Sequence, residues 1–439
     1  MPTTRRCVVS WSSPGVGRRC TTRWSTRPRS RSRSTSSLAD EPDDRAIMRS
    51  GYDVVVVGAR IAGASTAMLL GRAGLRVLVL ERGRPGTDTV STHALMRAGV
   101  LQLSRWGLLD AVVAAGTPAI RTSTFRYAGQ PPLRIPIRPS AGVEALSAPR
   151  RRLLDGILVD AAADAGAAVR FGANVSGLLR DGSGRVRGVA TVDGRRYSAD
   201  LVVGADGVHS RIASLAAAPV IATRVGASAV RYRYVEGLDP DGYEWSYGSG
   251  AAVGVIPTND GCHCVFVATT PERMRSTRAS LNAESAFDAI LRAVDPAQAD
   301  RVAGARLVGR ETGWRGRTGF LRQSWGAGWA LVGDAGSFKD PITSHGISDA
   351  LRDSELLAHA IVDGLGSAGE QAALESYQRT RDRLTLPLLT AGADVARYDW
   401  ADEEIPGILR RLSAAMVDEV SMLEHLALPG SEVRSISAG

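Results

Sequence analysis

Lysine is almost absent from this sequence: of its 54 basic residues, only Lys339 is not an arginine. Cysteine is also scarce, and Cys262 and Cys264, which flank His263, lack the second ligand pair that a zinc site needs. No apolar run approaches the ~18 residues of a membrane span. Neither a Ser-His-Asp arrangement nor a cluster of metal ligands can be read from the sequence, so nothing indicates a triad hydrolase or a metalloenzyme.

The composition is that of an ordinary globular protein, with 44% hydrophobic and 23% charged residues in 439. A chain of this length can bury a large core and form two or three domains. The net charge of +9 comes from residues 1–39, which hold nine arginines and no acidic residue. The remaining 45 basic residues match the 45 acidic ones. The body is therefore neutral overall, and we expect no nucleic-acid partner.

Residues 1–47 are predicted to be a disordered tail, because a segment so rich in Arg, Ser and Thr cannot bury enough apolar surface to fold. Two interpretations are open: an RNA-binding arm or, as we prefer, a segment ahead of the true start at Met48. The sparse use of cysteine suits a reducing compartment, so we expect a cytoplasmic protein.

The chain is organised around residues 52–83, which read as a strand, a turn, a helix and a second strand. The valines of residues 53–57 are typical of a parallel strand that is buried on both faces. A helix is expected over 61–72, ended by Gly74 at the C′ position. The second strand, over 76–80, leads to Glu81, which stands 23 residues after Gly58. This spacing is typical of a dinucleotide-binding unit.

The turn of this unit has the sequence GARIAG. Its first and third glycines, Gly58 and Gly63, fit the G-x-G-x-x-G fingerprint, but Arg60 stands where the second glycine is expected. The helix after the turn directs its free N–H groups at a phosphate, and the acid at Glu81 can bind a ribose hydroxyl. An ordinary βαβ crossover remains the alternative interpretation of the turn alone.

Two further turns follow strands of the same buried type. Residues 201–211, LVVGADGVHSR, end a strand at a turn from which Asp206 projects. Residues 329–332 form a strand that ends at Gly333-Asp334, and the loop PITSHG then leads to a helix from about Ile347. His93, after the loop that follows Glu81, is either a proton carrier or a structural hydrogen-bond partner.

The rest of the chain is predicted to form a second layer. Residues 119–148 and 220–275 are rich in strands, with aromatic residues at alternating positions. We expect this aromatic stripe to be core packing rather than a substrate wall. Residues 280–303 and the C-terminal part read as helical. The alternating aromatic residues are Tyr232, Tyr234, Trp245 and Tyr247.

These three turns, in this order and about 150 and 130 residues apart, resemble the three fingerprints of the class A flavoprotein monooxygenases, the family of para-hydroxybenzoate hydroxylase. The resemblance covers Tyr52 to Leu389. It implies an α/β fold: a Rossmann-like FAD-binding domain of the glutathione-reductase type, an inserted antiparallel β-sheet substrate domain and C-terminal helices. The implied division is an FAD-binding domain of residues 48–118, 150–218 and 305–365, a substrate domain of 119–149 and 219–304, and C-terminal helices at 366–439.

The resemblance also implies roles for individual residues. The pyrophosphate of FAD is expected at the first turn, the adenosine ribose at Glu81 with Arg82, and the ribityl chain or its neighbouring pyrophosphate at Gly333-Asp334. Asp206 belongs to a motif tied to both FAD and NAD(P)H. His345 stands where the family often has glycine or glutamine. The remaining implied FAD contacts are Ala59, Ile61 and Ala62 in the first turn, Arg97 at a phosphate or ribose, Arg151 on the flavin side, and Pro341, Gly346 and Ile347 beside the isoalloxazine ring.

The reaction implied is the hydroxylation of an aromatic or polyketide-like small molecule, with NAD(P)H as reductant and dioxygen as the source of oxygen. His93 and His345 are the candidate catalytic residues. The alternative is an FAD-dependent reductase or dehydrogenase similar to geranylgeranyl reductases. A halogenase is disfavoured because residues 252–257 lack both tryptophans of the halogenase motif and no lysine follows Glu81 nearby. A non-enzymatic protein similar to GDP-dissociation inhibitors is disfavoured by Glu81, Asp334 and the Pro341 loop.

Overall fold

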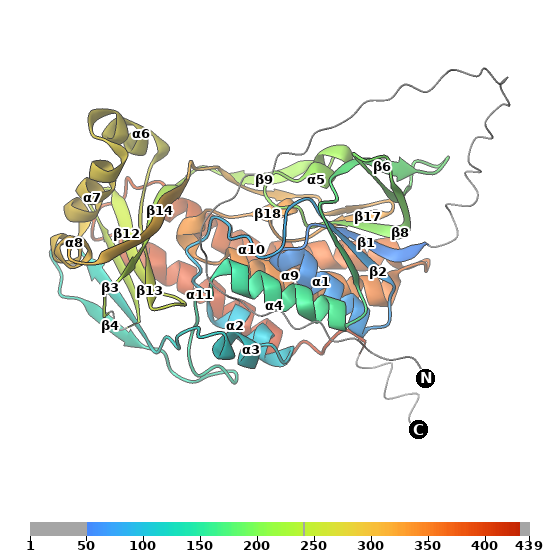
Figure 1. Ribbon diagram of the computed structural model, residues 1–439, viewed down its shortest axis with the longest axis horizontal. Helices are drawn as coiled ribbons and strands as arrows, with labels where there is room; N and C mark the ends of the chain where they lie inside the picture. The colour runs from blue at the N-terminus through green and yellow to red at the C-terminus, as the bar shows by residue number, and fades with distance from the viewer. Residues whose placement is uncertain (1–50, 240–241, 431–439) are drawn as a thin grey trace, which may run out of the picture. The chain divides into compact units, whose positions relative to one another are not determined.

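The structure is a computed structural model, and it describes residues 51–239 and 242–430. The expectations for residues 1–47 lie outside this part of the chain. The described strands form three sheets, and helices cover the two larger sheets (Figure 1). The predicted α/β class, with a parallel sheet, an antiparallel second sheet and C-terminal helices, is confirmed.

The first sheet is built on the valine run. Strand β1 (Tyr52–Val57) pairs in parallel with β2 (Val77–Glu81) on one side and with β8 (Arg196–Gly204) on the other. Val54 and Val56 are buried in the core on one face of the sheet, while Val55 and Val57 are buried on the other face. The alternation of side chains along a strand therefore places valine in two separate cores.

The first sheet has a parallel centre with antiparallel strands added to it. Strand β8 begins five residues before the predicted strand at residue 201, because no turn residue separates residues 196–200 from it. Hairpin β6–β7 joins the sheet by pairing of β7 with β8. The other strands of this sheet are β5 (Ala168–Phe171), β6 (Val175–Arg180), β7 (Val186–Thr191), β16 (Trp325–Gly326) and β17 (Trp329–Leu331).

Helices cover one face of the first sheet. The helix of the first turn, α1 (Ile61–Arg72), packs against α4 (Arg151–Asp164) and α9 (Gly346–Gly364), and its core is continuous with theirs. Gly74, which follows α1, has a φ of +90°, as expected for a residue at C′. The smaller helices of this part are α2 (Arg97–Arg105), α3 (Leu109–Ala114) and α5 (Arg211–Leu215).

The second sheet is antiparallel apart from one parallel pair, β3 with β11. One face carries the alternating aromatic residues in a single buried cluster, and the other face is covered by helices. Of these helices, α6 was not predicted, because PERMRSTRAS has no apolar stripe. The strands, in spatial order, are β14 (Arg306–Trp314), β10 (Ala229–Glu236), β13 (Cys262–Thr269), β12 (Ala251–Pro257), β11 (Tyr243–Gly248), β3 (Thr122–Tyr127) and β4 (Leu133–Pro136). The helices are α6 (Pro271–Ser280), α7 (Ala283–Val294) and α8 (Pro296–Ala303).

Two strands lie in other sheets than the predicted division implies. β14 pairs with β10 of the second sheet, although its residues were assigned to the FAD-binding domain. β9 (Val220–Arg224) pairs with β15 (Gly319–Arg322) in a small third sheet, although it was assigned to the substrate domain. The third sheet is completed by β18 (Ser337–Phe338). The division into domains stays a prediction.

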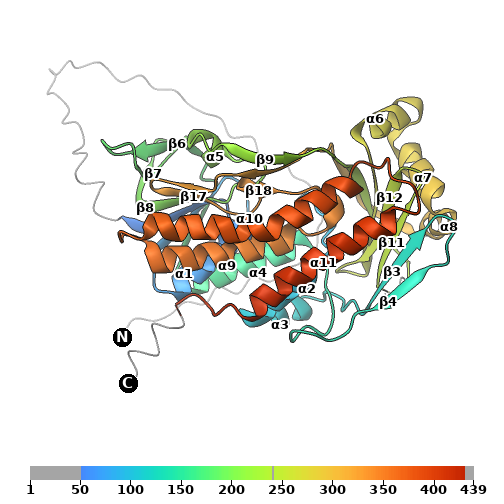
Figure 2. The same cartoon turned by 180° about the vertical axis from the view of Figure 1, so that it is seen from behind.

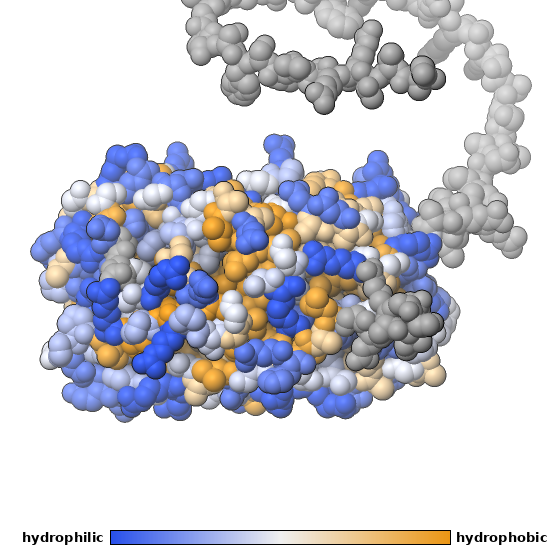
Figure 3. All heavy atoms as spheres, turned by 90° about the horizontal axis from the view of Figure 1, so that it is seen from below, coloured by the Kyte–Doolittle hydropathy of each residue, from blue (hydrophilic) through white to orange (hydrophobic). Residues whose placement is uncertain are grey.

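Two long helices end the described chain. Helix α10 (Glu370–Val395) packs on α9, and α11 (Ile405–Glu424) packs on α10 and α2 (Figure 2). Within the described ranges, no helix is both long and apolar enough to cross a membrane. The face in Figure 3 has a group of hydrophobic residues near its centre, surrounded by hydrophilic ones.

Candidate functional site

Three turns meet at one end of the first sheet. They follow β1, β8 and β17, which are neighbouring strands in the order β17-β8-β1, and all three strands run in parallel. The turn after β17 is a short 3₁₀ helix, η2 (Gly333–Ala335). Since the carboxyl ends of parallel strands lie at the same edge, turns far apart in the sequence come together there.

The turns touch one another so closely that side chains are excluded. Gly58 has a φ of +108°, and a methyl group added to it would lie 2.4 Å from the carbonyl oxygen of Ala205 in the second turn. A methyl group at Gly63 would lie 1.8 Å from the carbonyl oxygen of Gly58. One at Gly333, where φ is +60°, would lie 2.9 Å from the Cβ of Ala62. Glycine is therefore required by backbone contacts at Gly58 and Gly63, and by the left-handed φ and the contact with Ala62 at Gly333.

A cavity of about 810 Å³ opens beside these turns and extends to the second sheet. Most predicted site residues line it, but Ala59, Gly63 and Gly333 lie in the turns without lining the cavity. The predicted residues along its wall are Gly58, Arg60, Ile61, Ala62, Glu81, Arg82, His93, Arg151, Asp206, Asp334, Pro341, His345, Gly346 and Ile347.

Arg97 lies elsewhere and does not line the cavity. Its guanidinium donates hydrogen bonds to the carbonyl oxygens of Arg138, Ser140 and Val143, at 2.8, 3.0 and 3.1 Å. It anchors the loop that precedes α4. The predicted contact of Arg97 with a phosphate or ribose therefore has no support in its placement, because its guanidinium binds these loop carbonyl groups and does not line the cavity.

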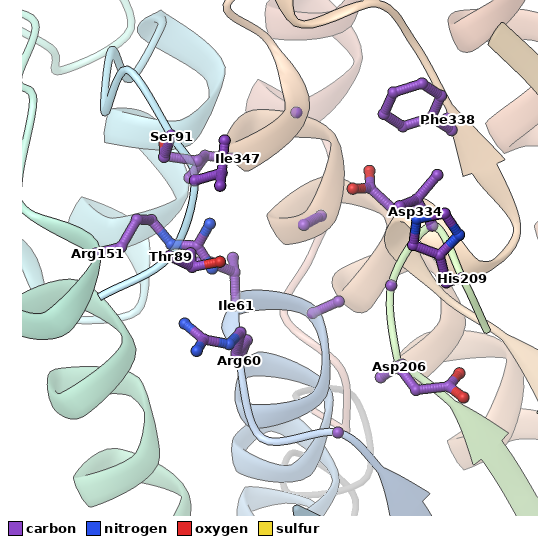
Figure 4. A pocket seen from close by; sticks show the side chains of 18 of the residues that line it. Arg60, Ile61, Thr89, Ser91, Arg151, Asp206, His209, Asp334, Phe338 and Ile347 are labelled. Carbon is purple, nitrogen blue, oxygen red and sulfur yellow. The ribbon is translucent and has the colours of Figure 1, made fainter. Parts of the chain in front are cut away.

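One wall of the cavity is cationic. Arg60 and Arg151 both pair with Asp155 of α4, at 2.9 and 3.0 Å, and they stand on the same side of the cavity in Figure 4. Two guanidinium groups on one carboxylate leave a net positive charge. Arg60 has φ −87° and ψ −167°, so its position does not require glycine. Helix α1 has no side-chain cap at its N-terminus, so its first N–H groups are free to bind an anion.

The opposite wall carries two aspartates with different surroundings (Figure 4). Asp206 accepts hydrogen bonds from Ser210 Oγ and from the backbone N–H groups of Arg211 and Ile212, so it caps α5. Asp334, in contrast, has no hydrogen-bond or ion-pair partner among the residues that the structure describes. Burial, reinforced by the charge of Asp349, raises the pKa of Asp334 to about 6. A ligand that donates hydrogen bonds would satisfy this carboxylate.

Glu81 ends β2 at the edge of the same cavity. Its carboxylate accepts hydrogen bonds from the backbone N–H of Ala59, at 2.9 Å, and of Gly83, at 2.6 Å. These bonds fix the carboxylate beside the first turn. Because each carboxylate oxygen can accept a second bond, the group can still bind a hydroxyl.

His93 stands between the cavity and the second sheet. It is completely buried, and its backbone has the uncommon φ of +70°. Its Nε2 makes a short hydrogen bond with the hydroxyl of Tyr234. Burial, followed by the positive charges of Arg150 and Arg151, lowers the pKa of His93 to about 3 against the effect of Asp88. The imidazole is therefore neutral at pH 7.

Several residues at the second-sheet end of the cavity were not predicted. Trp314 of the second sheet lines the cavity there, together with Phe338 of the third sheet, whose ring contacts Trp314, and the adjacent Lys339. They were missed because nothing in the sequence around a single aromatic residue or lysine indicates whether its side chain will line a cavity. The predicted aromatic stripe is core packing, since all four residues are buried in one cluster, and of these only Tyr232 also lines the cavity.

A second cleft of about 710 Å³ lies on the other side of Trp314, which lines both. Its walls include Arg231, Arg275, Arg278 and Arg315. Arg231 pairs with Glu311 and Arg275 with Glu272. In the part of the chain with described positions, Arg278 and Arg315 have no ion-pair partner.

Comparison with known families gives the identity that this geometry suggests. The profile of the family "FAD binding domain" matches residues 51–389. This chain belongs to that family. The matched residues are almost the same as Tyr52 to Leu389, the stretch over which the sequence resembles the class A flavoprotein monooxygenases. The predicted family is therefore confirmed. This FAD-binding protein is accordingly an FAD-dependent oxidoreductase.

Two curated relatives of this FAD-binding protein differ in activity. The menaquinone reductase of Mycolicibacterium smegmatis is 26% identical over 72% of this chain and 78% of its own length. The 6-methylpretetramide 4-monooxygenase of Streptomyces rimosus is 33% identical over 38% of this chain and 41% of its own length. One relative is a reductase and the other a monooxygenase, so the two do not indicate a single reaction.

Solved structures of FAD-dependent halogenases and monooxygenases share the fold. The flavin-dependent brominase Bmp2 superimposes with a TM-score of 0.73 at 19% identity, over 89% of this chain and 99% of its own. PqsL, a probable FAD-dependent monooxygenase from Pseudomonas aeruginosa, gives 0.72 at 22%, over 82% of this chain and 100% of its own. At such low identity the likeness shows the fold alone.

The cavity of this FAD-binding protein has features that fit FAD. The uncapped N-terminus of α1 and the net charge of the Arg60, Arg151 and Asp155 group suit a pyrophosphate. The unpartnered carboxylate of Asp334 suits the hydroxyls of a sugar-like chain. Which residue contacts which part of FAD stays a prediction.

Proposed function

We propose that this protein is an NAD(P)H-dependent FAD monooxygenase that hydroxylates an aromatic or polyketide-like small molecule. In the net reaction, R–H, dioxygen, NAD(P)H and a proton give R–OH, water and NAD(P)⁺. NAD(P)H is oxidised, one oxygen atom of dioxygen enters a C–H bond, and the other leaves as water. Bound FAD supplies the redox chemistry, while the protein binds, orients and excludes water.

The observation that carries this proposal is the continuity of the cavity. A single space joins the three turns, which suit a dinucleotide, to Tyr232 and Trp314 of the second sheet and Phe338 of the third sheet. A planar ring system bound beside Pro341 and Ile347 would face these aromatic walls. Walls of this kind favour an aromatic substrate and keep water away from the reacting atoms.

His93 and Tyr234 are the proposed proton-handling pair. As a neutral imidazole, His93 can accept a proton from a substrate hydroxyl or pass one through the Tyr234 hydroxyl. Among described residues His93 Nδ1 has no hydrogen-bond partner, which leaves this atom free for such a role. Of the neighbouring Asp88–Arg150 pair, at 2.5 Å, Asp88 favours a proton on the ring and Arg150 opposes it.

A reductase of the same fold is the second candidate. It is favoured by the menaquinone reductase and by a digeranylgeranylglycerophospholipid reductase, because they match 72% and 79% of this chain, whereas the 6-methylpretetramide 4-monooxygenase matches 38%. A halogenase remains disfavoured: the lone lysine follows the third turn, and residues 252–257 carry no tryptophan.

The test is a comparison of aerobic and anaerobic turnover. Aromatic and polyketide-like compounds are screened for stimulated NAD(P)H oxidation, and products formed under ¹⁸O₂ are analysed by mass spectrometry. A monooxygenase incorporates one ¹⁸O atom per product. Anaerobic reduction of a quinone or an isolated alkene, with no label incorporated in air, would establish the reductase instead. The Asp334→Ala variant is expected to lose bound FAD and both activities.

A further inference from the structure

The candidate cavity is backed by a buried cluster of charges, here called the α9 charge cluster, which consists of Lys339, His345, Asp349, Arg352 and Glu419. Lys339 pairs with Asp349 at 2.5 Å, and Arg352 pairs with both Asp349 and Glu419 at 2.8 Å. His345 Nε2 makes a short hydrogen bond with Glu419. Arg352, His345 and Glu419 are completely buried.

Burial of so many charges is costly unless each is paired, and apolar residues of similar size commonly stabilise a core better. The position of the α9 charge cluster beside the cavity indicates that these buried charges have a function other than stability. Lys339 and His345 line the cavity, while Asp349, Arg352 and Glu419 stand behind them. Burial alone would raise the pKa of Glu419, but His345 and Arg352 lower it below its usual value. The carboxylate is therefore ionised and holds both neighbours.

A metal ion is a poor explanation of this cluster. One ligand atom from each of His345, Asp349 and Glu419 lies within 4.8 Å of the others, which is close enough for a shared ion. However, Lys339 and Arg352 already occupy the two carboxylates as counter-ions. A third cation between them would be repelled, so the carboxylates serve side chains of this chain.

His345 is held by only one of its two ring nitrogens. Nε2 is bonded to Glu419, whereas Nδ1 has no partner in the described part of the protein. The residue forms the N-cap of α9, whose N-terminal end carries partial positive charge. Ser344, just before it, has a left-handed φ of +51°, so the loop that leads to His345 is itself constrained.

We propose that Glu419 is a positioning residue of this cavity: it holds the His345 ring through Nε2 and leaves Nδ1 as the atom available to a ligand at the N-terminus of α9. Glu419 belongs to α11, which lies beyond residues 51–389 that match the family. A helix outside the FAD-binding family region thus completes the site. This inference rests on the proposal that the cavity holds FAD, but not on the substrate or the reaction.

The first test compares Glu419→Gln with Glu355→Gln. The Glu355 carboxylate is equally buried, accepts from Gln102 and Arg105, and does not line the cavity, so it is a matched control. Glu419→Gln is expected to bind FAD about tenfold more weakly and to shift the midpoint potential of the bound flavin. Glu355→Gln is expected to change neither. Equal effects in the two variants would overturn the inference.

The second test asks whether Glu419 acts through His345. The potential and the FAD affinity are measured for His345→Gln and for the double variant with Glu419→Gln. If Glu419 only positions His345, both single variants shift the potential in the same direction and the double variant matches His345→Gln. Additive effects would mean that Glu419 acts by another route, and the inference would be wrong.

A third variant, Glu419→Asp, tests the inference if Glu419→Gln does not fold. Glu419→Asp keeps the charge that Arg352 needs but shortens the side chain by one methylene, so its hydrogen bond to His345 is weakened. It is expected to shift the potential in the direction of His345→Gln, and an unchanged potential would contradict the inference. All measurements use FAD alone without substrate, so failure to hydroxylate any compound would affect the proposed reaction and leave this result standing.

Discussion

The two ends of the cavity are built by different physical means. At the end formed by the three turns, backbone meets backbone at Gly58 and Gly63, and Gly333 lies against Ala62, so any side chain at these three glycines would collide. At the end formed by the second sheet, the wall consists of side chains such as Tyr232 and Trp314. Positions in the three turns accept few residue types, because the space beside them is filled. Positions in the wall of the second sheet accept many residue types, so this end of the cavity can be adapted to a substrate.

The strongest test of this difference is substitution at Gly63. Gly63→Val would place carbon atoms against the carbonyl oxygen of Gly58, so we expect a loss of more than about 3 kcal/mol in stability and no bound FAD. Gly156→Ala, in α4, is the matched control, since an added methyl there meets nothing within 4 Å. It should stabilise the protein by roughly 0.5–1 kcal/mol. Thermal unfolding measures the stability of both variants, and flavin absorbance measures their bound FAD. A folded Gly63→Val variant that retains FAD would show that the turn can shift to admit a side chain.

The next largest effect is expected at Asp334, where binding and stability should change in opposite directions. Asp334→Asn should weaken FAD binding about 10- to 100-fold by replacing an ionised acceptor. Because burial raises the pKa of Asp334 from 3.8 to about 6 in the folded state, its contribution to stability is full below pH 3.8 and is lost as pH rises through 6.

The FAD-free Asp334→Asn variant should therefore be more stable than the parent at pH 7.5, by about 1–3 kcal/mol, and no more stable at pH 3.5. We expect the gain in stability to be about 1 kcal/mol, because Asp334 lines the cavity and is only partly buried. Unfolding of the FAD-free proteins at both pH values measures this. An equal difference at the two pH values would exclude titration of Asp334 as the cause.

A smaller effect is expected at the aromatic end. Tyr232→Leu should retain FAD and raise the KM for an aromatic substrate about five- to tenfold, because Tyr232 lines the cavity. Tyr247→Leu is its counterpart in the same aromatic cluster but away from the cavity, so it should lower stability and leave KM unchanged. If Tyr232→Leu instead released FAD, the two ends of the cavity would be coupled more tightly than their construction suggests.

The smallest effect is expected in the second cleft. Arg278 and Arg315 are exposed and have no ion-pair partner within the described chain, which makes them candidates for contacts with the phosphates of NAD(P)H. The double variant Arg278→Gln/Arg315→Gln should raise the KM for NAD(P)H about two- to fourfold at low salt, with less difference at high salt. An Arg292→Gln variant on α7, outside this cleft, is the control. If the KM for NAD(P)H is unchanged in the double variant, the cleft does not bind NAD(P)H.

The same difference between the ends explains how much was predictable. The turns at Gly58, Asp206 and Gly333 were found in the sequence because close backbone approach requires glycine, and buried parallel strands require runs of valine and leucine. The resemblance to the family was carried by these three turns, and the comparison confirms it. The first five residues of β8 were not predicted as part of that strand, because local alternation around Ala199 carries no sign of continuity.

The residues that were missed lack such requirements. Helix α6 has no apolar stripe, so its Thr270 cap and Pro271 were the only signals available. Glu419 lies 74 residues from His345, and nothing local marks a carboxylate that will be buried against a distant ring. Arg97 was assigned to FAD by its position in a motif, but its direction is set by the loop carbonyl groups that it anchors. Such pairings depend on tertiary packing.

The burial of Lys339 has a practical consequence for work with this protein. Its amine is the sole ε-amino group in the sequence, and it is paired with Asp349 inside the folded chain. Amine-reactive dyes, cross-linkers and resins will consequently find no lysine on the folded surface. Acylation of Lys339, located by peptide mass mapping to distinguish it from acylation of the α-amino group, would therefore measure how readily a reagent enters the cavity.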